Sequence, residues 1–368
     1  MDKVLITGGC GFIGRALTAE LLDAGYDVRV FDSLVEQVHE AGAPELPAQV
    51  EVQTGDMRDA AAVKKALDGV NGVFHLAAEV GVGQSMYEIT RYVGANELGT
   101  AVLLEAMIDR PIRRIVVASS MSIYGEGRYV DASGAPHDHI RRKARDIAAG
   151  QWELHDAQGQ PLRPVATDEE KQPDLASIYA LNKYAQERAS LIFGDTYETD
   201  AVALRLFNVF GPGQALSNPY TGVLANFASR IASGERPTIF EDGQQQRDFV
   251  HVRDVARAFR LAFEKPEAAG HAINIGSGQA YSIERVARIL AEAMGKPDLS
   301  PEIMRKARAG DIRNCFADIS KARELLGYQP RYRLEDTVGE LADWVAKQTV
   351  IDRGAEMRRH LEQRGLVK

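Results

Sequence analysis

The chain has 368 residues, of which 44 are Lys or Arg and 52 are Asp or Glu, so its formal net charge at pH 7 is −8. Hydrophobic residues make up 45% and charged residues 26% of the sequence, values typical of soluble globular proteins, which excludes a disordered or fibrous chain. The acidic balance provides no general attraction to nucleic acid or to an anionic membrane surface, so neither is an expected partner.

Cysteine usage and the amino terminus indicate the compartment. Cys10 and Cys315 are the only cysteines, too few for a disulfide framework or a thiolate metal site. No apolar run approaches the roughly 18 residues of a membrane span, and the first residues pass into a strand-like segment without a basic, apolar leader. The sequence therefore predicts a cytoplasmic protein without a metal site.

The first part of the chain alternates short β-branched runs with helical stretches. Between the first two runs, residues 15–24 place Leu17, Leu21 and Leu22 on one helical face, and Gly25 ends the helix. This alternation predicts an α/β fold built on a Rossmann-type, doubly wound parallel sheet. The expected strands cover residues 4–7, 28–31, 50–53, 73–76, 115–118 and 201–206.

Glycines follow the first strand in a pattern suited to a dinucleotide. Gly8, Gly11 and Gly14 stand between strand and helix, with Phe12 and Ile13 among them. The first glycine permits a tight turn, the second lets a pyrophosphate approach the backbone, and the third allows close packing of helix on strand. Because a helix amino terminus presents free N–H groups and a partial positive charge, this context predicts a dinucleotide site.

Acidic residues close the second and third strands. Asp32 stands where a carboxylate accepts hydrogen bonds from the adenosine ribose hydroxyls and repels a 2′-phosphate. No Lys or Arg occurs in residues 33–36, which favours NAD over NADP. Asp56, with Met57 beside it, is expected to lie against the adenine.

Three residues form a candidate reactive group. Tyr179 and Lys183 are four residues apart, hence on one face of a helix. A nearby ammonium, together with the positive charge of an oxidised nicotinamide, favours the phenolate, so Tyr179 can remove a proton from a sugar hydroxyl. Ser120 ends the fifth strand, at the edge where open α/β sheets bind ligands, and can hydrogen-bond an oxygen that alternates between alcohol and ketone.

The remaining sequence suggests how the chain is divided. We expect an NAD-binding domain over residues 1–205, containing a polar insert at about 128–172 with three His and no clear strand pattern. Residues 206–348 are expected to form a smaller α/β substrate-binding lobe, partly interleaved with the first domain. An amphipathic helix is expected there, and residues 349–368 form a charged tail. The helix is marked by Leu334, Val338, Leu341 and Val345.

Several blocks, in order along nearly the whole chain, resemble the extended short-chain dehydrogenases/reductases, and within them the nucleotide-sugar epimerase/dehydratase branch. The resemblance implies that Ser120, Tyr179 and Lys183 form the catalytic triad, that Lys183 also binds the nicotinamide ribose, and that Ala77 and Asn96 lie along the cofactor. The blocks are residues 7–14, 75–78, 119–120, 179–183, 206–212, 247–254 and 274–278.

The same resemblance implies a nucleotide-diphosphate sugar as substrate and a homodimer whose interface includes the helix bearing Tyr179. An acidic protein that binds a diphosphate needs focused guanidinium groups, because Arg forms bidentate bonds with phosphate oxygens. Asn208, Arg247 and Arg308 are expected on the diphosphate and Asp311 on the nucleoside ribose. Ser122 completes the expected substrate-binding set.

Three reactions compete within this branch. A 4,6-dehydratase typically carries an Asp-Glu pair after the catalytic Ser or Thr, and Met121 and Ser122 at these positions disfavour it. A 4-ketoreductase often uses NADPH, which Asp32 disfavours. A C4 epimerase that holds NAD tightly is therefore expected, inverting C4 through a transient 4-keto intermediate. A non-catalytic NAD-sensing protein is a further alternative, but Ser120, Tyr179 and Lys183 are all present.

The sequence says less about the role of the insert and the identity of the substrate. The insert resembles that of dTDP-L-rhamnose 4-epimerases, some of which carry Cys pairs there, but this chain has none. His137, His139 and His155 are more typical of solvated residues than of a zinc site. We expect the insert to act as a lid or an interface loop. The substrate stays open among a dTDP-6-deoxyhexose, UDP-glucose or UDP-galactose, a UDP-N-acetylhexosamine and UDP-glucuronate.

Overall fold

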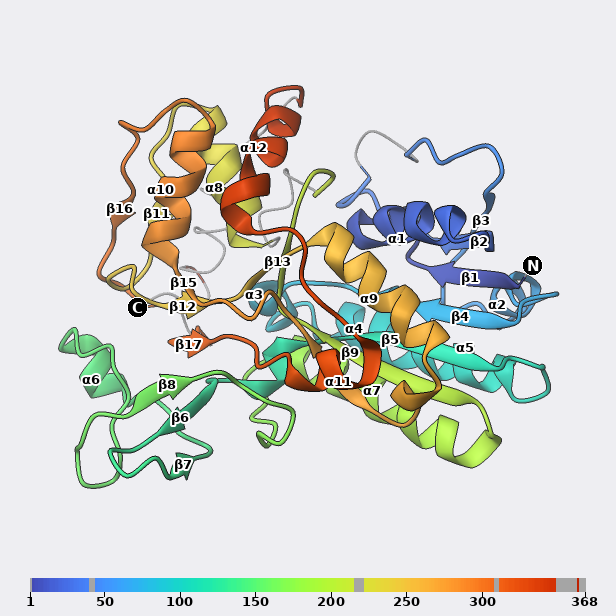
Figure 1. The fold of residues 1–368 in the computed structure, drawn as a ribbon, viewed down its shortest axis with the longest axis horizontal. Helices are drawn as coiled ribbons and strands as arrows, with labels where there is room; N and C mark the ends of the chain where they lie inside the picture. The colour runs from blue at the N-terminus through green and yellow to red at the C-terminus, as the bar shows by residue number, and fades with distance from the viewer. Residues whose placement is uncertain (1, 40–43, 215–221, 308–310, 349–362, 364–368) are drawn as a thin grey trace.

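A computed structural model of the chain describes residues 2–39, 44–214, 222–307, 311–348 and 363. Its centre is one sheet of seven parallel strands in the order β14-β9-β5-β4-β1-β2-β3 (Figure 1). The six strands predicted from sequence are all present, and β14 is an addition that pairs with β9 from the range expected for the lobe. The strands are β1 Lys3–Thr7, β2 Asp27–Asp32, β3 Glu51–Thr54, β4 Gly72–His75, β5 Arg114–Ser120, β9 Asp200–Leu206 and β14 Ala272–Ile275.

Helices cover both faces of this sheet because its strands carry apolar side chains on both sides. Val4 and Ile6 of β1 pack beneath α1 and α9, whereas Leu5 between them packs toward α2 and α5. Figure 1 shows α1 and α9 on one face and α5 and α7 on the other. The layers confirm the doubly wound fold. The helices are α1 Phe12–Asp23, α2 Ala60–Ala66, α3 Val82–Ser85, α4 Ile89–Tyr92, the π-helix η1 Val93–Leu98, α5 Gly99–Met107, α7 Ile178–Tyr197, α9 Val252–Glu264, the 3-10 helix η3 Pro266–Ala268 and α11 Ser320–Leu326.

A smaller lobe lies beyond the carboxyl ends of the strands, on the left of Figure 1. Its core joins Phe227, Leu290 and Leu341 from three helices. The predicted amphipathic helix is α12, whose Leu334, Val338, Leu341 and Val345 are all buried. The lobe contains α8 Val223–Ala232, α10 Ile283–Ala293, α12 Leu334–Val345, β11 Thr238–Ile239 and β16 Glu302–Ile303, and short ladders pair β10 Asn208–Phe210 with β13 Phe249–His251 and β12 Gln246–Arg247 with β15 Tyr281–Ser282 and β17 Asn314–Cys315.

The insert has more regular structure than the sequence indicated. Three short strands, β6 Arg128–Val130, β7 Pro136–His137 and β8 Arg163–Val165, form an antiparallel sheet beside α6 Ala144–Ala148. Strands of two or three residues are too short to display an alternating pattern, which is why the sequence of the insert shows no clear strand pattern. None of the helices in the described part is both long and apolar enough to cross a membrane.

Candidate active site

The glycine-rich turn after β1 has no room for side chains at two of its predicted positions. Gly8 has a φ of 69°, and a Cβ there would lie 2.8 Å from the backbone nitrogen of Ala77. A Cβ on Gly14 would lie 2.5 Å from the Cα of Gly9, so the third glycine brings α1 against the turn. These contacts match the steric roles predicted for the first and third glycines.

The amino terminus of α1 is open to an anion. Gly11 is the N-cap residue, and no side chain caps the helix, so the first-turn N–H groups that follow at Phe12 and Ile13 have no side-chain acceptor. Twelve residues of aligned peptide dipoles add a partial positive charge at this end. The geometry fits the pyrophosphate of a dinucleotide.

Asp32 ends β2 beside this turn. One carboxylate oxygen accepts a hydrogen bond from the Cys10 N–H at 3.0 Å and the other from the Leu34 N–H at 2.9 Å. A carboxylate has about four lone-pair sites, so this arrangement fixes its orientation and retains acceptor capacity for ribose hydroxyls. The residues present therefore fit the adenosine half of NAD.

Asp56 follows β3, but its carboxylate has a strong local partner. Arg58 donates to it from Nε at 2.9 Å and from Nη2 at 2.5 Å, and these bonds lower the pKa of Asp56. Met57 is buried beneath Gly99. The predicted contact of Asp56 with adenine stays a prediction.

The three candidate catalytic residues meet at the carboxyl end of the sheet. Ser120 is the last residue of β5, and Tyr179 and Lys183 lie in the first turns of α7. Ser177 caps this helix by accepting the Ala180 N–H at 3.1 Å. Burial raises the pKa of Tyr179, and a hydrogen bond with Ser120 acts in the opposite direction.

Lys183 is almost completely buried, at 3% exposure. Burial lowers its pKa to about 7, although the nearby carboxylate of Glu187 favours the charged form. Its ammonium donates to Gln186 Oε1 at 2.8 Å, and Gln186 Nε2 donates to the hydroxyl of Thr100 at 2.8 Å. The reactive ammonium is thus held by a buried polar chain that sequence reasoning did not identify.

His75, the last residue of β4, completes that chain. Its Nε2 lies 2.8 Å from Thr100 Oγ1 and its Nδ1 lies 2.7 Å from Thr7 Oγ1. Thr100 donates its own hydroxyl hydrogen to the Asn96 carbonyl at 2.6 Å, and this assignment favours the His75 tautomer with its proton on Nε2, although Gln186 Nε2 also lies 3.2 Å from that nitrogen. Burial and, to a lesser degree, the charge of Lys183 lower the pKa of His75 to about 3, so the imidazole is neutral.

A buried ion pair between Glu187 and Arg205 holds α7 against the sheet near these residues. Glu187 accepts hydrogen bonds from Ser119 Oγ at 2.6 Å and from Arg205 at 2.6 and 3.0 Å. These bonds join α7 to β5 and β9 directly behind Ser120. Arg205 also donates to the hydroxyl of Tyr124 at 2.9 Å. The pair fixes the helix that carries Tyr179 and Lys183 relative to the strand that carries Ser120.

Asn96 and Ala77 stabilise the loop after β4. The amide of Asn96 accepts the Glu79 N–H at 2.7 Å and donates to the Glu79 carbonyl at 3.1 Å, and the residue is fully buried in the π-helix. The Ala77 N–H donates to Thr7 Oγ1 at 3.3 Å. The side chain of Asn96 therefore positions the backbone along the expected cofactor site.

The residues predicted to bind substrate lie on the lobe side. Ser122 Oγ is buried, and the described residues give it no hydrogen-bond partner. Asn208 donates to the Asp248 carbonyl at 3.0 Å, and Arg247 donates to the carbonyls of Gln246, Ile312 and Arg313 at 2.5 to 2.8 Å. Three of the five N–H groups of Arg247 are thus used on neutral carbonyls. Asp311 lies in the segment before β17, and Arg308 lies outside the described residues.

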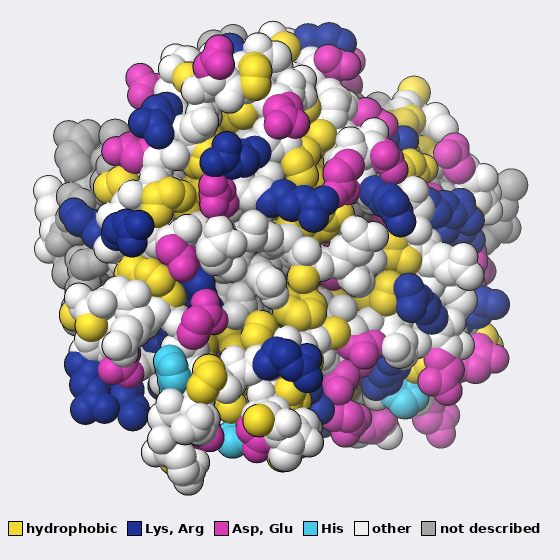
Figure 2. Space-filling view, turned by 60° about the vertical axis from the view of Figure 1, so that its left-hand side comes forward, with side chains coloured by type: hydrophobic (Ala, Val, Ile, Leu, Met, Phe, Trp, Pro, Cys, Tyr) yellow, Lys and Arg dark blue, Asp and Glu magenta, His cyan; other side chains and the backbone are white. Residues whose placement is uncertain are grey.

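Neither the face drawn in Figure 2 nor the insert histidines His137 and His155 indicate an additional charged site. On the face drawn in Figure 2, acidic and basic side chains are intermingled over the described residues. His137 lies 3.1 Å from Asp131 Oδ2, and His155 Nδ1 lies 3.1 Å from the Glu153 carbonyl. The described part of the chain contains no group of three or more His, Cys, Asp or Glu that could hold a metal ion.

Comparisons with known proteins identify the family of this chain. Residues 4–276 match the model of the NAD dependent epimerase/dehydratase family. A dTDP-L-rhamnose 4-epimerase of Burkholderia thailandensis is 36% identical over 94% of this chain and 95% of its own length. A UDP-glucose 4-epimerase of Corynebacterium glutamicum is 29% identical over 95% of this chain and 97% of its own length. The solved structure of a UDP-glucuronic acid 4-epimerase from Bacillus cereus, with UDP-glucuronic acid and NAD, superposes with a TM-score of 0.76 at 26% identity, covering 93% of this chain and 98% of that one.

Proposed function

The chain belongs to the NAD dependent epimerase/dehydratase family and is an NAD-dependent nucleotide-sugar epimerase, and from this premise we propose that it inverts C4 of a dTDP-6-deoxyhexose of the dTDP-L-rhamnose type, or of a UDP-hexose. The observation that carries this proposal is the meeting of Ser120, Tyr179 and Lys183 at the carboxyl edge of the sheet, beside the glycine-rich turn. The choice of substrate rests on the two relatives named above, a dTDP-L-rhamnose 4-epimerase and a UDP-glucose 4-epimerase.

The cofactor site divides into two ends. Gly8, Gly11 and the first turn of α1 hold the pyrophosphate of NAD, and Asp32 holds the adenosine ribose. Lys183 holds the nicotinamide ribose at the other end. When bound, NAD accepts a hydride from C4 of the sugar and returns it. The carboxylate of Asp32 makes a 2′-phosphate unfavourable, which supports NAD over NADP.

The chain's own residues move the proton and orient the sugar. Tyr179 acts as general base on the 4-hydroxyl, and Ser120 donates a hydrogen bond to the same oxygen. Burial disfavours the phenolate of Tyr179, so a positive charge near it has a large effect on its ionisation. Lys183 and the oxidised cofactor supply that charge. Once the proton has left, Ser120 stabilises the carbonyl oxygen of the 4-keto sugar.

Inversion requires the ketose to present its other face before Tyr179 returns the proton. The sugar must therefore turn while its nucleotide stays bound. Asn208, Arg247, Arg308 and Asp311 are proposed to hold the nucleoside diphosphate, and the unpartnered hydroxyl of Ser122 is proposed to contact the sugar. Met121 and Ser122 after Ser120 provide no carboxylate for elimination across C5 and C6, which favours epimerisation over dehydration.

The test follows C4 inversion directly. Purified protein, without added cofactor, is incubated with dTDP-L-rhamnose and separately with UDP-glucose, and proton NMR records the sugar while denatured protein is assayed for released NAD. Inversion of one sugar without net NADH is expected. Tyr179→Phe, which retains the ring and removes the hydroxyl, should lose about 100-fold or more of the rate while retaining NAD. Net NADH consumption with 4-keto sugars would replace the proposal with a reductase.

We also propose that the protein is a homodimer joined through α7. Leu181 and Ile192 are 45% and 56% exposed, and they lie about three turns apart on one face of this helix. Leu98, 52% exposed, ends the neighbouring π-helix. Light scattering should show a dimer, and Leu181→Glu with Ile192→Glu should shift it to monomer. Val52→Glu, at a similarly exposed position on the sheet edge, should leave the mass unchanged.

A further inference from the structure

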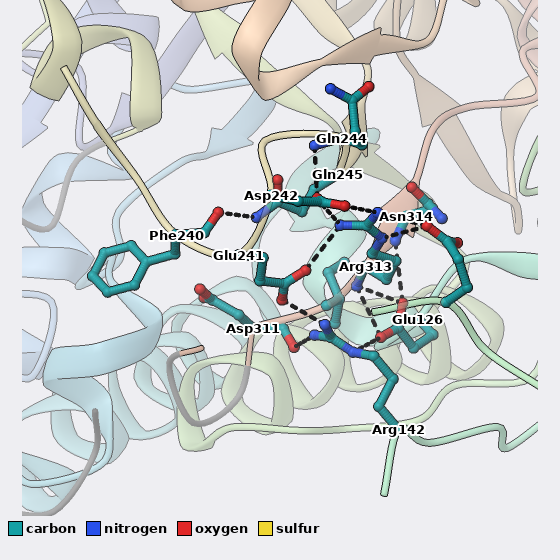
Figure 3. A network of polar contacts seen from close by, with 12 residues as sticks. Glu126, Arg142, Phe240, Glu241, Asp242, Gln244, Gln245, Asp311, Arg313 and Asn314 are labelled. Atoms are coloured by element: carbon teal, nitrogen blue, oxygen red, sulfur yellow. Dashed lines mark hydrogen bonds and ion pairs between the residues drawn. The ribbon is translucent and has the colours of Figure 1, made fainter. Parts of the chain in front are cut away.

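The insert meets the lobe through a cluster of charged side chains whose centre is buried and whose edge, at Asp242 and Glu153, is partly exposed (Figure 3). This charge cluster consists of Glu126, Arg142 and Glu153 from the insert and the residues leading into it, and Glu241, Asp242 and Arg313 from the lobe. The side chains of Arg142, Glu241 and Arg313 are at most 5% exposed. Buried ion pairs of this kind hold a defined geometry because separating them would leave charges without partners.

Arg142 connects three separate segments. Its Nη1 donates to Glu241 Oε1 at 2.5 Å, its Nη2 donates to the backbone carbonyl of Asp311 at 2.7 Å, and its Nε lies 3.4 Å from Glu126 Oε1. The planar guanidinium can satisfy these directions together, which an ammonium cannot. The Arg142 side chain therefore links the insert to the backbone of Asp311.

Glu241 bonds to residues 305 and 306, which precede Asp311 in the chain. Its backbone N–H donates to the Lys306 carbonyl at 2.8 Å, and its carbonyl accepts the Arg305 N–H at 3.0 Å. Its side chain binds both Arg142 and Arg313. The Glu241 backbone thus holds residues 305–306, and the Arg142 side chain, which is bonded to the Glu241 carboxylate, holds residue 311.

The insert itself has little apolar packing to hold it in place. Its own core consists of Tyr129, Leu154 and Leu162, with Ile140 packed against them. Arg313 instead bonds to Glu153 of the insert at 2.6 Å and to Asp242 of the lobe at 2.6 Å. These polar contacts are more typical of a fixed support than of a lid that opens, because opening would separate several ion pairs at once.

We propose that the insert supports the nucleotide end of the substrate site, and that Arg142 is a positioning residue that sets the Asp311 segment for the nucleoside diphosphate. The inference rests on the proposed function, in which Asp311 binds the nucleoside ribose. Within the described residues, the hydrogen bonds and ion pairs of Arg142 all go to Glu126, Glu241 and Asp311, and none goes to Ser120, Tyr179 or Lys183. Its loss should therefore weaken substrate binding and leave the chemical step intact.

The experiment compares Arg142→Lys and Arg142→Met with Arg145→Met. Lysine retains a cation beside Glu126 and Glu241, so the fold is preserved, but it cannot also hold the Asp311 carbonyl. Arg145 is the matched control, because it lies in the same insert, its side chain is 77% exposed and, among the described residues, that side chain pairs only with its neighbour Asp146. Calorimetry measures the Kd of dTDP and of UDP for each NAD-loaded protein, and steady-state rates give kcat and KM.

Arg142→Lys should raise the Kd of the bound diphosphate and the KM of the nucleotide sugar by about tenfold, with kcat within about twofold of wild type. A tenfold change corresponds to about 1.4 kcal/mol, the order of one hydrogen bond. Bound NAD should be unchanged, and Arg145→Met should match wild type. Unchanged Kd and KM, or a fall in kcat alone, would overturn the inference. If wild type binds dTDP or UDP but inverts no sugar, the proposed function fails while the Kd comparison still decides the role of Arg142.

Discussion

The buried imidazole of His75 provides a quantitative test of the polar chain behind the active site. Its pKa is lowered from 6.5 to about 3, so between these values the unfolded chain binds a proton that the folded protein does not. Stability therefore falls as the pH decreases from about 6.5 toward 3. At about 1.4 kcal/mol per pH unit, His75 should remove about 3 kcal/mol of the unfolding free energy between pH 7.5 and pH 4.5.

The assay is denaturant unfolding of wild type and His75→Gln at both pH values. Glutamine keeps a donor and an acceptor near Thr100 and Thr7 but does not titrate. On acidification the variant should therefore lose about 3 kcal/mol less of its unfolding free energy than wild type does. Comparing the two differences removes the cost of the substitution itself. Equal losses in wild type and His75→Gln would refute the neutral, buried imidazole.

Two further predictions concern the turn and the ion pair. Gly14→Ala would bring a methyl group 2.5 Å from Gly9 Cα, so it should lower the free energy of unfolding by about 1–3 kcal/mol and lower the amount of bound NAD measured after denaturation. Gly339→Ala is the control in α12, where the added Cβ would meet no heavy atom of the described residues within 4 Å outside the helix's own backbone, and it should raise the free energy of unfolding by up to about 1 kcal/mol. A Gly14→Ala protein with normal stability and full NAD would contradict the steric account. Glu187→Gln would leave the buried charge of Arg205 without its carboxylate, so it should lower the free energy of unfolding in urea by about 3–5 kcal/mol. A loss below about 1 kcal/mol would show that the ion pair does not stabilise the fold.

The sheet and the glycine-rich turn could be predicted because their signals are local. Each β-branched run of the first domain is a strand within one or two residues of the expected bounds, and the turn follows β1 as its spacing indicated. Strand β14 was not predicted, since its four residues lie far along the chain beyond the boundary placed at 205 and join the sheet only through β9. A strand of this length has no periodicity strong enough to distinguish it from the lobe.

The proximity of Ser120, Tyr179 and Lys183 could be predicted from sequence, whereas the residues that hold them in place could be predicted only in part. Gln186 and Glu187 follow Lys183 by three and four residues, so helical spacing alone places them on its face, and this signal was present in the sequence. The partnership of His75 with Thr100 was not accessible in this way, because it joins β4 to α5 across the tertiary fold. Likewise, nothing local in the insert indicates that Arg142 reaches Asp311.

The arginines near the nucleotide end divide into two kinds, and this division explains how an acidic protein can present a usable positive charge. Arg142 and Arg313 are each bonded to two or more carboxylates, so their charges are offset within the charge cluster. Arg247 instead donates to three backbone carbonyls, which orient its guanidinium without offsetting its charge. An oriented cation with neutral partners is the better ligand for a diphosphate, because it gives up no ion pair on binding. The paired arginines join the insert to the lobe, and Arg247 is, among the described residues, the arginine that we propose for the diphosphate.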